Sequence, residues 1–120
     1  MIKILSWNNR GLGHPSKNNA LKDLINQEKP TIVLLQETKQ RQPKINKIIE
    51  YHKRYKGCIC DSRGASGRIA TLWLQDEWIS TIEVIEQHWV KIVLQNNMSR
   101  QQIVIYNVYA PNHYRDKEVC

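Results

Sequence analysis

Polar side chains that could hold a metal ion or a phosphate follow three apolar segments of this chain. Asn8 and Glu37 each come directly after an apolar run, and a third run ends at Tyr109, just before Asn112. A carboxylate at the end of a buried strand needs a partner. Mg²⁺ is one such partner, because it prefers carboxylate oxygens completed by water and phosphate. The residues alone leave a second interpretation open, in which Glu37 caps a turn or pairs with Lys39.

The segment around Tyr109 has its own chemistry. A proline at position 111 stops the strand, so Asn112 should project from a tight turn beside Tyr109. A phenol hydroxyl and an amide can orient a phosphate or a water molecule by hydrogen bonding. The alternative is that Tyr109 packs at a strand end with its hydroxyl in solvent.

The elements that must position these residues begin with a strand, a helix and a second strand. Residues 2–7 and 31–36 are mostly apolar, and the intervening helix should open at Pro15 and stop before Pro30. This order predicts a parallel βαβ unit. Since the carboxyl ends of parallel strands share one edge, Asn8 and Glu37 should lie close together.

The rest of the chain should form one more helix and a set of antiparallel strands. Helical spacing of apolar residues predicts a helix over residues 44–55. Alternation with a period of two then predicts strands at residues 69–74, 78–85, 89–94 and 102–109. The expectation is an α/β domain with a βαβ start, a mixed sheet and an antiparallel meander.

The net charge of +7 is concentrated in one block. Residues 39–63 contain eight lysines and arginines against Glu50 and Asp61. Such a block favours a polyanionic partner, although a solvated helix face would carry the same charges. The chain has no apolar run of 18 residues, so no membrane span is expected. Its three cysteines are an odd number, which favours reduced thiols in an intracellular protein.

Three short motifs, taken together, resemble a known superfamily. They are SWNNRGL at residues 6–12, LQETK at residues 35–39 and YAPN at residues 109–112. Their order and spacing are similar to the first signature blocks of the exonuclease–endonuclease–phosphatase superfamily. WNNRGLG at residues 7–13 and SGRIATLW at residues 66–73 look more specifically like plant LINE-type (non-LTR) retrotransposon endonucleases.

The resemblance implies a DNase I-like, four-layered α/β/β/α sandwich that cuts phosphodiester bonds with Mg²⁺ or Mn²⁺. By the same resemblance Glu37 and Asn8 would serve the metal, with Glu37 as the ligand and Asn8 orienting the site. Tyr109 and Asn112 would contact the scissile phosphate. The implied partner is DNA, and a DNA substrate implies a nuclear protein.

Four cations beside the motifs are the predicted contacts to the nucleic acid: Arg10, Lys39, Arg41 and Lys44. Arg10 stands where abasic-site endonucleases of the superfamily carry an aspartate two residues after the motif asparagine. This difference argues against specificity for abasic sites.

The largest departure from the family pattern lies in its second half. The motifs Gly-Asp-x-Asn and Ser-Asp-His, which supply the water-activating groups, do not occur in the 120 residues. The expectation is therefore a partial domain over residues 1–120 with weak or no turnover. A missing C-terminal half, or a reverse transcriptase domain in the full-length element, would complete it.

A partial sandwich should also leave apolar sheet surface and strand edges exposed. Trp73, Trp78 and Trp89 are candidates for that surface, although aromatic residues in strands more often belong to the core. The alternative function is a non-catalytic nucleic-acid-binding remnant of the same fold. A phosphatase of the superfamily is the third possibility, which the motif at residues 7–12 disfavours.

Overall fold

The computed structural model of the chain describes residues 1–9, 12, 14–36, 38, 42–60, 69–86 and 88–108, and for residues 42–46 and 60 it describes the backbone only. Helices and strands follow one another in this order: β1 (Ile4–Asn8), α1 (Pro15–Glu28), β2 (Ile32–Gln36), α2 (Gln42–Tyr51), β3 (Tyr55–Cys60), β4 (Ile69–Leu74), β5 (Trp78–Ile85), β6 (Trp89–Asn96) and β7 (Gln102–Val108).

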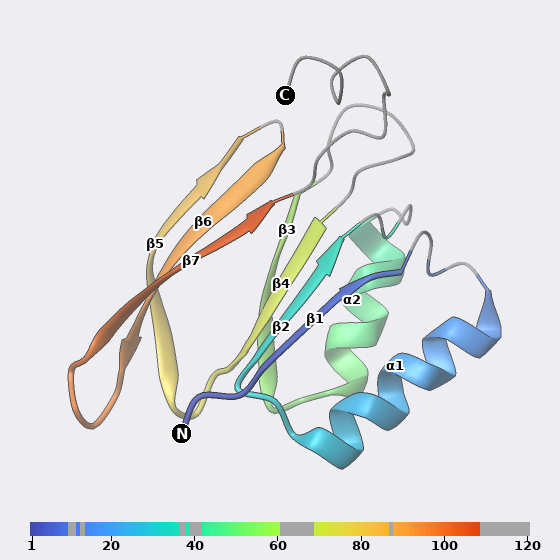
Figure 1. Ribbon diagram of the computed structural model, residues 1–120, viewed down its shortest axis with the longest axis horizontal. Coiled ribbons are helices and arrows are strands. Elements are labelled where there is room, and N and C mark those ends of the chain that lie inside the picture. The colour runs from blue at the N-terminus through green and yellow to red at the C-terminus, as the bar shows by residue number, and fades with distance from the viewer. Residues whose placement is uncertain are drawn as a thin grey trace.

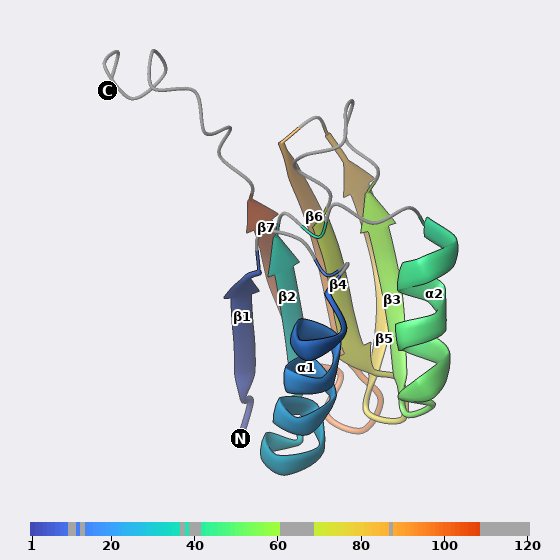
Figure 2. The ribbon, with the colours of Figure 1, turned by 90° about the vertical axis from the view of Figure 1, so that its right-hand side faces the viewer.

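The strands form two sheets. One is a mixed sheet in the order β1-β2-β4-β3, and the other is an antiparallel sheet in the order β5-β6-β7. Figure 1 shows both helices on one side of the mixed sheet and the antiparallel sheet on its other side. Helices, mixed sheet and antiparallel sheet thus make three successive layers, which Figure 2 shows from the helix side, with the antiparallel sheet at the back. The predicted α/β class with an antiparallel meander is confirmed.

The predicted βαβ unit is also confirmed. β1 and β2 are parallel neighbours, with Asn8 opposite Gln36 at their carboxyl ends. His14 caps the start of α1 by accepting a hydrogen bond from the Ser16 N–H (3.2 Å), and Pro15 occupies the first turn, where its missing N–H costs nothing. The helix ends at Lys29, which adopts a left-handed backbone with φ 45°.

The predicted helix over residues 44–55 is wrong at its end. α2 stops at Tyr51, and Tyr55 opens β3, which pairs antiparallel with β4 along six residues. A turn closes between them, where the Tyr55 N–H donates to the His52 carbonyl (2.9 Å). The helical spacing of apolar residues in α2 continues to His52. The sequence pattern therefore does not show where the helix ends and the alternating pattern of β3 begins. Only the sheet partner β4 makes the extended conformation of β3 favourable.

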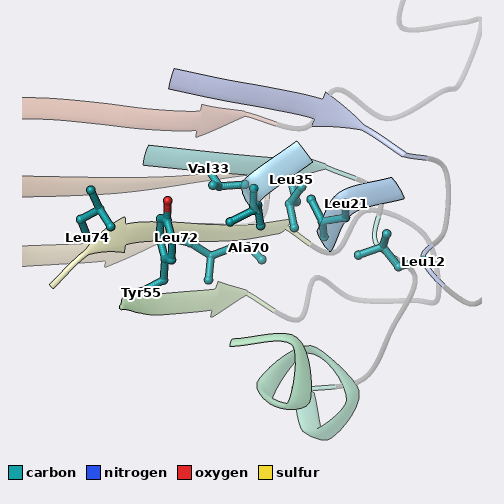
Figure 3. Close-up of a cluster of buried hydrophobic side chains, with 9 residues drawn as sticks. Leu12, Leu21, Val33, Leu35, Tyr55, Ala70, Leu72 and Leu74 are labelled. Atoms are coloured by element: carbon teal, nitrogen blue, oxygen red, sulfur yellow. The ribbon is translucent and has the colours of Figure 1, made fainter. Parts of the chain in front are cut away.

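Two hydrophobic cores flank the mixed sheet. The helix-side core contains, among others, the eight residues labelled in Figure 3: Leu12, Leu21, Val33, Leu35, Tyr55, Ala70, Leu72 and Leu74. The core between the sheets contains Ile32, Cys58, Ile69, Trp73, Trp78, Val90, Ile92 and Leu94. The mixed sheet is therefore covered on both faces, which explains why β4 is buried along its whole length.

The outer face of the antiparallel sheet is apolar, and no described residue covers it. Five of its side chains are each about half exposed: Ile79, Ile82, Val104, Tyr106 and Val108. The predicted exposed sheet surface is thus present, but two of the three candidate tryptophans do not lie on it. Trp73 and Trp78 are buried between the sheets, and only Trp89 is partly exposed. Within the described helices, no segment is long and apolar enough to cross a membrane.

Candidate active site

Three strands end together at one edge of the sandwich. Asn8 and Gln36 are opposite each other at the ends of β1 and β2, and the pairing continues one step further, because the Asn9 N–H donates to the Gln36 carbonyl (3.2 Å). β7 reaches the same place from the other sheet, where Asn107 accepts a hydrogen bond from Gln36. In Figure 2 the arrowheads of β1, β2 and β7 all point toward this edge. The three motif segments thus leave the fold at neighbouring positions.

The loops that follow β1 and β2 are tied to each other by the backbone. The Leu12 N–H donates to the Thr38 carbonyl (2.9 Å), and the Lys17 ammonium donates to the Asn9 carbonyl (2.7 Å). Leu12 and Thr38 are both buried. Thr38 Oγ1 has no hydrogen-bond partner among the described residues. The backbone on each side of position 37 is therefore held close to the end of β1.

Asn107 fastens the two sheets together at this edge. Its side chain is 1% exposed. Its Nδ2 donates to the Ala70 carbonyl (3.0 Å) and to Thr71 Oγ1 (3.1 Å), with the Leu35 carbonyl at 3.4 Å. Its Oδ1 accepts from Gln36 Nε2 at 2.9 Å. A buried amide with its donors and acceptor satisfied is a rigid junction.

Sequence reasoning did not assign this role to Asn107. The available signal was an amide inside an otherwise apolar strand, two residues before Tyr109. Gln36, its partner at the end of β2, also donates to Ser6 Oγ (3.3 Å) and thus serves hydrogen bonding at the strand end.

The layer between the sheets changes from apolar to polar toward this edge. Along β2, Ile32 and Leu34 belong to the core between the sheets, and Gln36 takes the next position on the same face. β1 contributes Ser6 and Asn8 on the corresponding side, both exposed. The edge therefore presents neutral hydroxyl and amide oxygens. Mg²⁺ binds oxygen ligands of this kind in addition to a carboxylate.

Most of the predicted site residues lie outside the described part of the chain. These are Glu37, Tyr109 and Asn112, together with the cations Arg10, Lys39 and Arg41. Asn8 is described and lies at the edge. Lys44 lies in the first turn of α2, and only its backbone is described. Among the described residues, no group of three or more histidines, cysteines, aspartates or glutamates is arranged to hold a metal ion.

Three described cations of the basic block do not line this edge. Lys53 and Arg54 are in the turn before β3, and Lys56 is in register with Trp73, which pairs with Ile32 at the start of β2. These three exposed cations thus lie at the opposite end of the mixed sheet from Asn8. Lys47, also exposed, lies on α2. A DNA surface at the carboxyl edge would need other cations.

Comparison with known proteins establishes the fold alone. No protein-family model matches this chain, and no curated protein matches its sequence. Solved structures do match. The human Nocturnin catalytic domain with a bound sulfate anion is 16% identical, with a TM-score of 0.73 over 88% of this chain. The 3′ phosphatase NExo from Neisseria, bound to a product DNA hairpin, is 15% identical, with a TM-score of 0.71 over 99% of this chain.

A third similar structure is D. rerio TDP2 complexed with a single-strand DNA product. It is 14% identical, with a TM-score of 0.69 over 98% of this chain. All three have the DNase I-like fold, which confirms the fold that the motifs implied. The chain spans about half the length of the solved chains it matches, namely 48%, 48% and 51% of them.

Proposed function

We propose that this chain is the N-terminal half of a divalent-metal-dependent endonuclease domain of LINE-type retrotransposon origin, acting on DNA, with little turnover of its own. The observation that carries the proposal is the convergence of three strand ends at the Gln36–Asn107 junction. Each of these strands leads into one of the motifs at residues 6–12, 35–39 and 109–112. Two of the three similar structures contain a DNA product, which supports a nucleic-acid substrate.

The residues at this edge would have two roles, one in binding a metal ion and the other in binding the scissile phosphate. Glu37 and Asn8 would hold Mg²⁺ or Mn²⁺, and the hard oxygens at the edge suit such an ion. When bound, the ion would neutralise charge on the phosphate and the leaving oxygen. The Tyr109 hydroxyl and the Asn112 amide would donate hydrogen bonds to the scissile phosphate. The junction at Asn107 would keep the ends of β2 and β7 at a fixed separation while the metal ion and the phosphate are bound.

Four cations would increase the affinity for DNA without a preference for a particular base sequence. Arg10, Lys39, Arg41 and Lys44 flank the motifs and would neutralise backbone phosphates, so DNA binding should weaken steeply with added salt. A DNA substrate would place the protein in the nucleus. A reverse transcriptase encoded by the same element would be its natural partner.

Low turnover follows from what the 120 residues lack. The Gly-Asp-x-Asn and Ser-Asp-His motifs that activate water in the resembled family are absent from the sequence. Proton transfer by a positioned side chain contributes about 10²- to 10⁴-fold to such reactions. The same absence favours the second candidate function, a nucleic-acid-binding remnant that does not cleave.

Nicking of supercoiled plasmid separates the two functions. With Mg²⁺ the chain should nick slowly, and both EDTA and Glu37→Ala should abolish the activity. Glu50→Ala is the matched control, because Glu50 is an exposed carboxylate on α2 and its loss should leave nicking unchanged. Nicking no faster than that of Glu37→Ala, with salt-sensitive DNA binding intact, would leave only the binding remnant.

A further inference from the structure

A concave site lies at the opposite end of the mixed sheet from the candidate active site. It is a pocket of about 240 Å³ between the end of α1 and the turn that leads from α2 into β3. Figure 1 shows these two helix ends beside the start of β3, away from the arrowheads of β1 and β2. β2 has five residues, so the two sites are separated by roughly 16 Å along the strand.

The lining of this pocket is positively charged. Lys29, Lys53 and Arg54 contribute to it, and its described lining contains no carboxylate. None of the three forms an ion pair with a described acid. Glu28, the neighbour of Lys29, is 3.8 Å from the Lys3 ammonium instead. Three cations around one concave surface repel one another and create a positive potential that an anion would relieve.

His52 gives the pocket a polar group that lacks a partner. The side chain is 8% exposed and lines the pocket, and its Nε2 has no hydrogen-bond partner among the described residues. The ring is held edge-on between Tyr51 (centroids 4.8 Å apart) and Tyr55 (6.3 Å). A buried nitrogen without a partner costs free energy.

The back of the pocket is fixed in place. The Tyr55 hydroxyl donates to the Pro30 carbonyl, and the His52 N–H donates to the Ile48 carbonyl (3.2 Å). Burial raises the pKa of Tyr55, which keeps its phenol neutral. The cations therefore surround a fixed aromatic wall that contains the buried His52 ring.

We propose that this pocket binds a phosphate-type anion, held by Lys29, Lys53 and Arg54 beside the His52 ring. Arginine offers a planar fork that matches phosphate oxygens, and lysine adds point charge. The anion could be a free phosphate or phosphate monoester, or a backbone phosphate of a nucleic acid strand. The proposal does not depend on the proposed function, because the site uses none of the motif residues.

Nuclear magnetic resonance of the histidine side chains provides a direct test with the whole folded chain. The chain is titrated separately with three probes: inorganic phosphate, adenosine monophosphate and a short single-stranded DNA. Chloride salt keeps the ionic strength constant in each titration. The His52 ring signals should shift and saturate, and the pKa of His52 should rise because a bound anion favours the imidazolium. The exposed His14 serves as an internal reference that should not follow this titration.

Matched variants make the result specific. Lys53→Gln with Arg54→Gln removes two exposed charges from the pocket, and affinity should fall about tenfold or more. Lys47→Gln with Lys56→Gln removes two exposed charges of the same basic block outside the pocket and should leave affinity within about twofold, as expected for screened charges. Circular dichroism verifies that both variants are folded.

Each result decides the question. Saturation with phosphate or adenosine monophosphate assigns the site to a free phosphate. Saturation with the oligonucleotide alone assigns it to a nucleic acid backbone. If no probe shifts His52, or if both double variants lose equal affinity, the pocket is a solvated basic surface and the proposal is overturned.

Discussion

Asn107 lies at the point where the two sheets meet at the candidate active edge. It links β7 to the Ala70 carbonyl and the Thr71 hydroxyl of β4 and to Gln36 of β2. A single amide thus replaces the apolar contacts that hold the sheets together elsewhere. Removing it would leave several buried polar groups without partners, which is more costly than losing a surface hydrogen bond.

Asn107→Ala should therefore lower the free energy of unfolding by about 1–3 kcal/mol. Asn97→Ala is the control, because Asn97 is exposed and donates one hydrogen bond to the Asp76 carbonyl (2.8 Å). Urea denaturation of both variants gives the comparison. Equal losses would show that the buried junction contributes no more than a surface turn.

His52 should make stability depend on pH. Its pKa is lowered from 6.5, first by burial and second by the charge of Lys22. The unfolded chain then binds a proton at higher pH than the folded chain does. The contribution of His52 to stability is therefore complete above pH 6.5 and is lost as the pH falls through the folded-state pKa.

Urea denaturation across this pH range measures the effect. His52→Gln should flatten the decrease in unfolding free energy below pH 6.5. Asn97→Ala, a change at an exposed position without a titratable group, is the control and should keep the wild-type slope. A His52→Gln profile parallel to that of the wild type would show that another group is responsible.

The change from α2 to β3 is decided by packing between elements. Gly57 lies in β3 where α2 crosses it, and a Cβ added there would be 2.7 Å from Ile49 Cδ1 and 3.0 Å from Leu72 Cδ2. The close approach of this helix to the sheet thus favours a residue without a side chain at this position. A helix continued to Tyr55 would lose both this contact and the six-residue pairing of β3 with β4.

Gly57→Ala should destabilise the chain by about 1 kcal/mol, within the range for overpacking. Ile49→Val removes the methyl group nearest to the new Cβ, so the double variant should lose less than the sum of the two single changes. A double-mutant cycle by urea denaturation measures this coupling. Simple additivity would contradict the proposed close contact.

At the scale of the whole molecule, the described residues leave the antiparallel sheet bare on its outer face. Register aligns Ile82, Val93 and Val104 across the three strands of this face. Ile82 and Val104 are about half exposed. Apolar surface of this kind on an uncovered sheet promotes association.

The chain should therefore bind an apolar fluorescent dye and associate as its concentration rises. Ile82→Thr with Val104→Thr keeps good strand formers and should reduce both effects while leaving the fold intact. Leu94→Thr, on the buried face, should instead lower stability. Sedimentation velocity and dye fluorescence provide the measurements. An unchanged sedimentation profile in the double variant would place the association surface elsewhere.

The sequence by itself determined the local elements and the identity of the motif residues. Proline and apolar periodicity defined α1 and the buried strand β2, because these signals depend on near neighbours in the chain. The motif order predicted the DNase I-like fold, which the similar structures confirm. The assignments of Glu37, Tyr109 and Asn112 remain predictions, since these residues lie outside the described part of the chain.

Only the tertiary structure decided which strands share a sheet and what lies between the sheets. It placed Trp73 and Trp78 inside the core, made Asn107 a junction and separated Lys53 and Arg54 from the carboxyl edge. The physical reason is that these outcomes depend on contacts between residues far apart in the chain, such as Gln36 with Asn107. Burial and hydrogen bonding across such distances leave no periodic signal in the sequence.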